Sequence, residues 1–126
     1  MTRITISKDC GNSPKNKLIQ QFTVAFARRE VKFILDSVTD TIRWNIVGIR
    51  SIEGKEELAE FIKGSKNNRV ASLTIHHIAS HGKAGAVDGT QKLKNGEMLA
   101  FCNVFEFGNT KGSTICEITS YVIPVK

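Results

Sequence analysis

The second half of the chain carries four stretches of alternating apolar and polar residues separated by short turn motifs, and this pattern constrains the fold most. A period of two is typical of strands that bury one face. Gly82-Lys83 and Asn95-Gly96 predict two-residue hairpin loops of types II′ and I′, because glycine and asparagine tolerate the positive φ that these turns need. We therefore expect an antiparallel sheet built from strands over residues 70–81, 84–94, 97–107 and 113–125.

The first half of the chain carries helix signals. Ser13 and Pro14 are typical of a helix start, since a hydroxyl caps free N–H groups and proline suits the first turn. Apolar residues at helical spacing follow, with glycine and lysine at the expected end of the last helix. The sequence predicts helices over residues 14–28, 31–37 and 54–64, and a strand over residues 41–47.

These elements predict an α+β fold. We expect N-terminal helices packed against a strongly curved, mixed, mostly antiparallel sheet that encloses an internal pocket. A length of 126 residues fits a single domain over residues 1–126. The chain is expected to fold throughout, apart from residues 1–12.

Charge and hydropathy narrow the class of partner. The net charge of +6 would favour anionic partners if the basic residues gathered in one place. They are spread over separate elements without interleaved aromatic residues, so we expect no nucleic-acid binding. The chain starts without an apolar signal-peptide stretch and has no run long enough to span a bilayer, so we expect a cytoplasmic protein with no membrane contact.

We expect neither a metal site nor a cofactor. Cys10, Cys102 and Cys116 lack metal-type spacing and are predicted to be reduced and mostly buried. Adjacent His76 and His77 point to opposite faces of a strand and cannot share one metal ion. The sequence has no glycine-rich phosphate loop and no nucleophile elbow.

The hairpin loops also predict which residues lie opposite one another. A two-residue first loop places His77 opposite Asp88, and a two-residue second loop places Asp88 opposite Asn103. These three side chains would form a polar row on the helix-covered face, among the phenylalanines of the neighbouring strand. A four-residue loop at residues 109–112 would place Ile118 opposite Asn103.

Two interpretations of this polar row stay open. A buried aspartate costs several kcal/mol unless it is paired, hydrogen-bonded or neutral. The row would therefore be the floor of a ligand pocket, with Asp88 or His77 as acid or base and Asn103 as a donor to a developing oxyanion. The alternative is a core network of satisfied hydrogen bonds, or a cluster that is in contact with water at the edge of the sheet. Trp44 is interpreted as a core residue first and a ligand wall second.

Three segments, with the order of the elements, resemble the nuclear transport factor 2-like superfamily. They are Trp44-Asn45-Ile46-Val47-Gly48, Gly54-Lys55-Glu56-Glu57-Leu58 and Phe101-Cys102-Asn103-Val104-Phe105-Glu106-Phe107. The resemblance covers residues 17–125 and implies a cone-shaped α+β fold, a deep apolar pocket and commonly a homodimer through the outer sheet face. Members include ketosteroid isomerases, SnoaL-like polyketide cyclases, dehydratases, epoxide hydrolases and non-catalytic domains, so the resemblance predicts fold better than function.

The catalytic residues of ketosteroid isomerases are not matched in this chain. Their general-base aspartate corresponds here to Asn45 or Trp44, neither of which accepts a proton as a carboxylate does. Their oxyanion aspartate matches Asn103, which can still donate a hydrogen bond, and their tyrosine falls near Phe22, which cannot. The resemblance therefore implies no steroid isomerisation by that mechanism.

From these observations we expect a SnoaL-like domain that binds an apolar or partly polar small molecule. The predicted ligand-binding residues are Phe22, Trp44, His77, Asp88, Asn103, Phe105 and Ile118. One alternative is a lyase or isomerase that uses Asp88 and His77 as an acid–base pair. Another is a non-catalytic dimeric interaction module that uses the outer sheet face.

Overall fold

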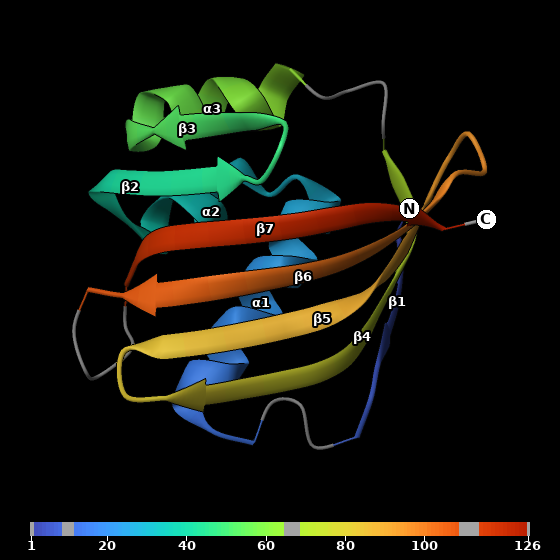
Figure 1. Ribbon diagram of the computed structural model, residues 1–126, viewed down its shortest axis with the longest axis horizontal. Coiled ribbons are helices and arrows are strands. Elements are labelled where there is room, and N and C mark those ends of the chain that lie inside the picture. The colour runs from blue at the N-terminus through green and yellow to red at the C-terminus, as the bar shows by residue number, and fades with distance from the viewer. Residues whose placement is uncertain (1, 9–11, 65–68, 109–113, 126) are drawn as a thin grey trace.

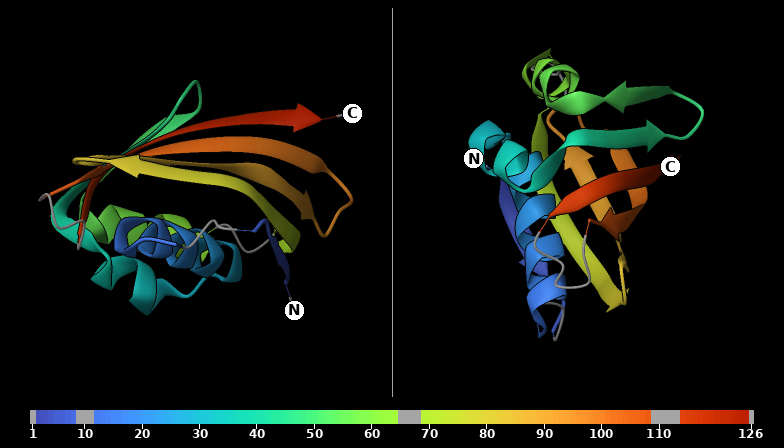
Figure 2. Two further views of the ribbon diagram at one scale, coloured as in Figure 1. Left: turned by 90° about the horizontal axis from the view of Figure 1, so that it is seen from below. Right: turned by 90° about the vertical axis from the view of Figure 1, so that its left-hand side faces the viewer.

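Three helices cover one face of a curved, seven-stranded mixed sheet in the computed structural model, which describes residues 2–8, 12–64, 69–108 and 114–125. The strand order is β1-β4-β5-β6-β7-β2-β3, with β1–β4 and β2–β7 parallel and the other neighbours antiparallel. Figure 1 shows the helices behind the sheet, and Figure 2 shows the sheet curving over them. The helices are α1 Pro14–Arg28, α2 Val31–Asp36 and α3 Gly54–Gly64. The strands are β1 Arg3–Ile6, β2 Val38–Ile46, β3 Arg50–Glu53, β4 Val70–His81, β5 Ala84–Leu93, β6 Met98–Phe107 and β7 Ile115–Val125.

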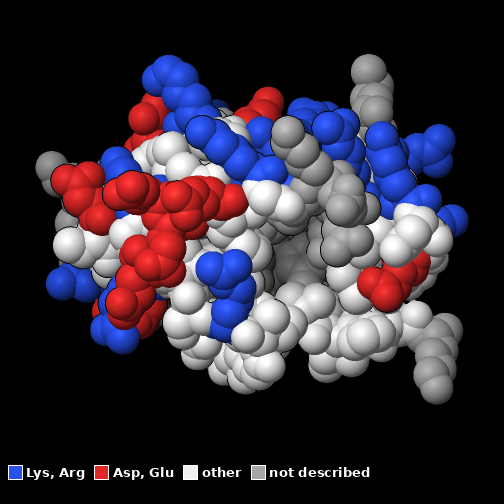
Figure 3. Space-filling view, turned by 90° about the horizontal axis from the view of Figure 1, so that it is seen from above, with Lys and Arg blue, Asp and Glu red and all other residues white. Residues whose placement is uncertain are grey.

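We call the sheet face that meets the helices the inner face and the opposite one the outer face. The predicted α+β architecture, with helices on one side of a strongly curved mixed sheet, is confirmed. Figure 3 shows the end of the molecule that carries α3 and β3. Acidic side chains gather at one side of this view and basic ones along the top, and a hollow with uncharged side chains along its lower edge lies near the centre.

The first helix has the predicted bounds. Ser13 Oγ accepts a hydrogen bond from the Asn16 backbone N–H at 3.2 Å, which satisfies one of the free donors of the first turn. The helix ends at Arg28. The next residue, Arg29, is the C-cap and has a left-handed φ of 58°, so the chain leaves the helix direction there. The Arg29 guanidinium donates to the Ile62 carbonyl at 2.9 Å and ties the end of α1 to α3.

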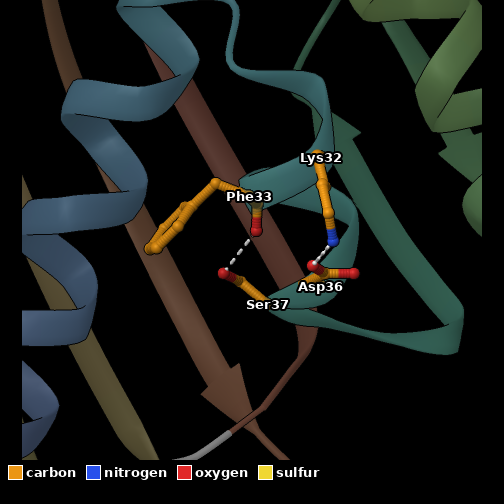
Figure 4. Close-up of polar contacts among 4 residues, drawn as sticks. All are labelled: Lys32, Phe33, Asp36 and Ser37. Carbon is orange, nitrogen blue, oxygen red and sulfur yellow. Dashed lines mark hydrogen bonds and ion pairs between the residues drawn. The ribbon is translucent and has the colours of Figure 1, made fainter.

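The second helix is short and is held by local side-chain contacts (Figure 4). Ser37 Oγ donates to the Phe33 carbonyl at 2.7 Å, and Lys32 Nζ lies 3.0 Å from the Asp36 carboxylate. The lysine–aspartate pair is exposed and contributes little, whereas the buried serine satisfies a carbonyl at the helix end. The strand that follows begins at Val38, three residues earlier than the predicted start at residue 41.

Two short edge strands escaped prediction. Arg3–Ile6 forms β1, which pairs in parallel with β4, so the expectation that residues 1–12 lie outside the fold was wrong for these four residues. Arg50–Glu53 forms β3, which pairs with β2 and buries Ile52 to 1% exposure. Strands of four residues are too short for an alternating pattern to stand out, and the pairing of β1 with β4 is not local.

Two glycines on the inner face of β5 allow the close packing around the core. A Cβ atom at Gly89 would lie 2.1 Å from the Thr74 carbonyl oxygen and 3.0 Å from the Phe101 ring. A Cβ atom at Gly85 would lie 2.5 Å from the Ile19 side chain of α1. Glycine is therefore needed at position 89, where the neighbour is backbone, whereas at position 85 the end of the Ile19 side chain would have to move.

The first hairpin has the predicted register, with His77 opposite Asp88. The second hairpin does not. The Leu93 N–H donates to the Glu97 carbonyl at 2.8 Å, so the loop has three residues, and Gly96 takes a positive φ of 93°. Three-residue hairpins that end in a bulged glycine are a common alternative to the two-residue loop that Asn-Gly predicts.

Because the second loop is one residue longer than predicted, the residues of the predicted polar row lie on two different faces of the sheet. Asp88 lies opposite Cys102, and Asn103 lies opposite Val87, which is 1% exposed. Because directly opposed residues share a face, Asn103 points inward while Asp88 and His77 point outward. The prediction that the three polar residues share the helix-covered face was wrong.

The pairing of β6 with β7 is shifted by two residues from the predicted one. Asn103 lies opposite Ser120, and Ile118 lies opposite Phe105 rather than opposite Asn103. A shift of two keeps every side chain on its predicted face, so Ile118 and Ser120 are buried and Tyr121 is exposed. The predicted loop at residues 109–112 lies outside the described residues.

Candidate ligand-binding site

A cavity of about 160 Å³ lies between α1, α3 and the inner face of the sheet. This is several times the roughly 15 Å³ that one water molecule needs. The apolar lining is Phe22, Phe26, Ala27, Trp44, Ile46, Phe61, Leu73, Phe101 and Val122. The polar lining is Thr23, Gln91, Asn103 and Ser120. None of these described lining residues is charged, and several are only half-buried, so the cavity is in contact with solvent.

Aromatic rings hold the shape of one wall. The ring of Trp44 packs at 5.9 Å from Phe22 and at 5.0 Å from Phe26, measured between ring centroids. Phe61 of α3 stacks on Phe26 at 6.2 Å and meets the Trp44 ring at 6.3 Å, and the Arg50 guanidinium lies 5.2 Å from its ring centroid. Contacts between aromatic rings contribute about 0.5–1.5 kcal/mol each beyond burial, so this wall is a preformed surface for a flat apolar molecule.

The polar lining groups lie on facing strands. The indole N–H of Trp44 on β2 donates to Ser120 Oγ on β7 at 2.7 Å, and Ser120 is 3% exposed. Asn103 on β6 lies directly opposite Ser120. The Thr23 hydroxyl instead donates to the Ile19 carbonyl within α1 at 2.8 Å, so it is already satisfied. The lining groups that can still donate a hydrogen bond to a ligand are therefore Asn103 and Ser120, with Gln91 on β5, while the Thr23 oxygen can still accept one.

The predicted binding residues divide into three groups. Phe22, Trp44 and Asn103 line the cavity. Phe105 and Ile118 are 1% and 0% exposed and lie outside its lining, with Phe105 packed edge-to-face on Phe22 at 5.8 Å. Binding of a ligand by these residues stays a prediction.

His77 and Asp88 form the third group, and neither lines the cavity. The two side chains meet each other, with His77 Nδ1 2.9 Å from Asp88 Oδ1. They are 83% and 45% exposed, so the contact is made on the solvent side of the sheet and is neither a cavity floor nor a core network. Catalysis by this pair stays a prediction.

The predicted binding set omitted Gln91, Phe101 and Ser120, which line the cavity. A signal for Gln91 is present in the sequence. The apolar residues Val87 and Leu93 share its parity along β5, whereas Asp88 belongs to the other parity. If the face of each β5 residue is predicted from this alternation and not from the loop length, Gln91 lies on the inner face and Asp88 on the outer face.

The described cysteines lie on the sheet away from the cavity lining and are both free and half-buried. Partial burial raises the pKa of the Cys102 thiol, and the Asp88 carboxylate raises it further. Partial burial also raises the pKa of Cys116, with Glu106 and Glu117 as additional causes. Both thiols are therefore protonated at neutral pH and are poor nucleophiles. Cys10 lies outside the described residues.

One further titratable group is shifted at the junction of α1 and α3. Burial lowers the pKa of Arg29, and the like charge of Arg69 lowers it further. The guanidinium remains charged at neutral pH because the ordinary pKa of arginine lies far above neutrality. It acts here as a structural donor to Ile62.

In the part of the chain that the structure describes, no three histidine, cysteine, aspartate or glutamate side chains come together as a metal site requires. A bilayer-spanning segment is likewise missing from the described helices, none of which is long and apolar enough.

No protein-family model matches the sequence, and no curated protein matches it. Solved structures do match. A protein of unknown function from Burkholderia xenovorans, described as nuclear transport factor 2-like, superposes with a TM-score of 0.75 at 15% identity over 89% of this chain and 84% of its own. The chain has the nuclear transport factor 2-like fold.

Relatives of this fold include enzymes and proteins without a known activity. An epoxide hydrolase of the LEH-like type from M. tuberculosis has a TM-score of 0.72 at 20% identity, over 85% of this chain and 80% of its own. A candidate SnoaL-like polyketide cyclase from Shewanella putrefaciens has a TM-score of 0.74 at 10% identity, over 87% and 90%. At such identities the likeness of this chain to either protein concerns the fold alone.

Proposed function

We propose that this nuclear transport factor 2-like domain binds a small, apolar, ring-containing molecule in the cavity between its helices and the inner face of its sheet. The observation that carries the proposal is an open cavity with a preformed aromatic wall and a few uncharged polar groups. Such a combination is typical of small-molecule sites, where apolar contact supplies affinity and a few polar groups fix orientation. Asn103 is the half-buried amide of the lining that would set the orientation.

Binding is proposed in preference to a reaction because the described lining of the cavity holds no carboxylate, histidine, thiol or lysine. General acid–base catalysis needs a titratable group within hydrogen-bond reach of the reacting atom. The alternative of a lyase or isomerase that uses Asp88 and His77 would need a substrate on the outer face. We also propose a cytoplasmic location, which the free thiols of Cys102 and Cys116 support because they fit a reducing compartment.

Fluorescence gives a direct test of ligand binding. Trp44 is the single tryptophan of the sequence and lines the cavity, so its emission reports on a bound ligand. Replacing Val122 by phenylalanine would fill the cavity and is expected to weaken binding at least tenfold, about 1.4 kcal/mol. Val125→Phe makes the same change on the same strand at a residue that is 45% exposed, and should leave binding unchanged.

The probes for this test are uncharged two-ring compounds, together with whatever molecule co-purifies with the protein and is detected by native mass spectrometry. Equal affinity of the wild type and the Val122→Phe variant would contradict binding in this cavity. Absence of binding by every probe and by any co-purified molecule would contradict the proposal as a whole.

A second proposal concerns self-association through the outer face of the sheet. Val104, Tyr121 and Ile123 lie on β6 and β7 with exposures of 41%, 48% and 64%. Neighbouring apolar side chains on one exposed face are typical of protein contact surfaces. We expect a homodimer in sedimentation experiments at micromolar concentration, converted to a monomer by Tyr121→Glu. A monomeric wild type would contradict this proposal and leave ligand binding untouched.

A further inference from the structure

We propose that the free edge of β1 pairs in antiparallel fashion with the same edge of a second copy of this chain, so that two sheets join across a two-fold axis at Thr5. This inference goes beyond ligand binding and beyond the proposed contact of the outer faces. The surface that carries it shares no residue with the cavity lining.

The two ends of the sheet differ in what lies beside them. At one end is β3, and α3 packs next to it in Figure 1. At the other end is β1, and no strand of the described chain pairs with its far side. An edge strand with a row of unpaired N–H and C=O groups is a template for pairing with another chain.

The backbone groups on this free edge belong to Ile4 and Ile6. The Ser7 N–H donates to the Ile75 carbonyl at 3.0 Å, so Ser7 bonds toward β4. Successive residues of a strand direct their N–H and C=O groups to alternate sides, so Thr5 also bonds toward β4. The two isoleucines therefore present two donors and two acceptors on the side away from β4.

An apolar groove lies directly beside this edge. It has a volume of about 330 Å³, and its apolar lining is Ile4 and Ile6 of β1, Val24 of α1 and Phe33 of α2. Figure 4 shows the Phe33 ring extending from α2 toward α1, and this side chain is 36% exposed. A strand added beside β1 would project every second side chain into the groove, because alternate residues of a strand share a face.

The order of residues along β1 is self-complementary, which favours a second copy as the occupant. Thr5 is flanked by Ile4 and Ile6, and these are flanked by Arg3 and Ser7. When two copies run antiparallel, Ile4 of each copy forms a hydrogen-bonded pair with Ile6 of the other. Thr5 then meets Thr5 of the second copy on the outer side. A register shifted by two residues would leave only one hydrogen-bonded pair within the strand.

Each copy fills the groove of the other in this arrangement. The isoleucines of β1 pack toward the helices, so those of the second copy lie against Val24 and Phe33. Like charges are not opposed, since Arg3 lies opposite Ser7 of the second copy. The contact is isologous and therefore closes on two copies. Because only four residues of each chain pair, we expect a transient dimer that forms above about 100 µM.

Cysteine cross-linking tests the register. In a protein whose three native cysteines are replaced by alanine, Thr5→Cys places two thiols across the two-fold axis at a spacing that suits a disulfide. Arg3→Cys alone and Ser7→Cys alone should cross-link poorly, whereas an equimolar mixture of these two variants should form the mixed dimer. We expect at least tenfold more disulfide-linked dimer from Thr5→Cys than from either single control, measured on a non-reducing gel after mild oxidation.

A proline variant tests the edge hydrogen bonds without disturbing the pairing with β4. Ile6→Pro deletes an N–H group that faces the free edge, a position at which a strand tolerates proline, whereas Ile6→Val keeps this group. Both changes are combined with Tyr121→Glu, so that the outer face does not contribute to association. In sedimentation at up to about 1 mM, we expect association about tenfold weaker with Ile6→Pro and unchanged with Ile6→Val.

The outcomes separate this inference from the proposals about the cavity and the outer face. A Tyr121→Glu protein that stays monomeric at about 1 mM, or equal cross-linking by Thr5→Cys and the two single controls, would overturn the edge contact. Thr5→Cys linked mainly to a different protein would assign the edge to another partner and overturn it as well. The cross-linking result stands alone if Ile6→Pro folds poorly. Ligand binding measured by Trp44 emission should be the same in all edge variants.

Discussion

Two neighbouring rows of residues cross the sheet, one on the inner face and one on the outer face. The rows differ in whether their polar side chains can carry a charge. The inner row holds Asn103 and Ser120, which are uncharged and lie against aromatic rings. The outer row holds His77 and Asp88, which can carry charge and meet in solvent. Asn103 follows Cys102 on β6, and Cys102 is the residue that lies opposite Asp88 of the outer row. Among the described residues, the hydrogen-bonding side chains of the cavity lining are neutral, whereas this ionisable pair lies in solvent, as the cost of burying a charge would lead one to expect.

The largest expected effect tests the close packing beneath the inner row. Gly89→Ala would place a Cβ atom 2.1 Å from the Thr74 carbonyl oxygen, where backbone has to move. We expect a loss of about 3 kcal/mol in the free energy of unfolding, measured by urea titration. Gly64→Ala, at the end of α3, would place its Cβ atom with no neighbour within 4 Å and should change stability by less than about 0.5 kcal/mol. Similar stability of both variants would show that β5 can move away freely.

The second prediction concerns the hydrogen bond of the inner row. Ser120→Ala leaves the Trp44 N–H buried without an acceptor, and we expect a loss of about 2 kcal/mol together with a shift in tryptophan emission. Ser51→Ala removes an exposed hydroxyl that contacts Asn45 at 3.5 Å and should cost less than about 0.5 kcal/mol. A Ser120→Ala variant as stable as the wild type would mean that water replaces the hydroxyl.

A charge placed in the inner row should make stability depend on pH. Asn103→Asp puts a carboxyl group in an uncharged, half-buried cavity, which raises its folded-state pKa above the ordinary 3.9. Relative to the wild type, the variant should lose no stability from ionisation below the unfolded-state pKa. It should lose about 1 kcal/mol as the pH rises from that value through the raised pKa.

Asn95→Asp provides the control for this pH dependence. The Asn95 side-chain oxygen is exposed and accepts a hydrogen bond from the Glu97 N–H at 2.9 Å, a contact that a carboxylate can keep. Its stability should therefore not fall as the pH rises. If Asn103→Asp showed the same flat profile, the cavity would be wet enough to solvate a charge.

The smallest expected effect lies in the outer row. Asp88→Asn removes one partner of an exposed pair, and such pairs contribute about 0–1 kcal/mol. We expect a change of less than about 0.5 kcal/mol that diminishes further in high salt, and unchanged quenching of Trp44 by a ligand. A loss of ligand binding in this variant would show that a change on the outer face affects the cavity. It would then favour the alternative in which Asp88 and His77 act as an acid–base pair.

The sequence predicted most elements because their signals are local. The Ser13-Pro14 start and the apolar spacing of α1 correspond to the observed Pro14–Arg28, and the predicted strand at residues 70–81 matches β4. The strands β1 and β3 escaped prediction because four residues carry too little pattern, and because β1 is stabilised by pairing with a distant strand. Local propensity has no access to such partners.

The candidate site was predicted less completely than the fold. Phe22, Trp44 and Asn103 were expected at the pocket and do line the cavity. Asp88 was placed inside because Asn95-Gly96 was interpreted as a two-residue loop, and one additional loop residue reverses every side chain of the strand relative to its neighbour. Loops of two and three residues both accommodate Asn-Gly, so the turn alone could not decide between them.

The sequence by itself determined the alternation of β5, the helical face of α1 and the uncharged character of residues such as Asn103. Tertiary structure alone decided which residues converge. Trp44 and Ser120 are separated by 76 positions along the chain and meet only because β2 lies parallel to β7 at the far side of the sheet. Burial of Val87 and Leu93 selected the hairpin register, since the free energy gained by covering apolar side chains outweighs the small difference between two loop lengths.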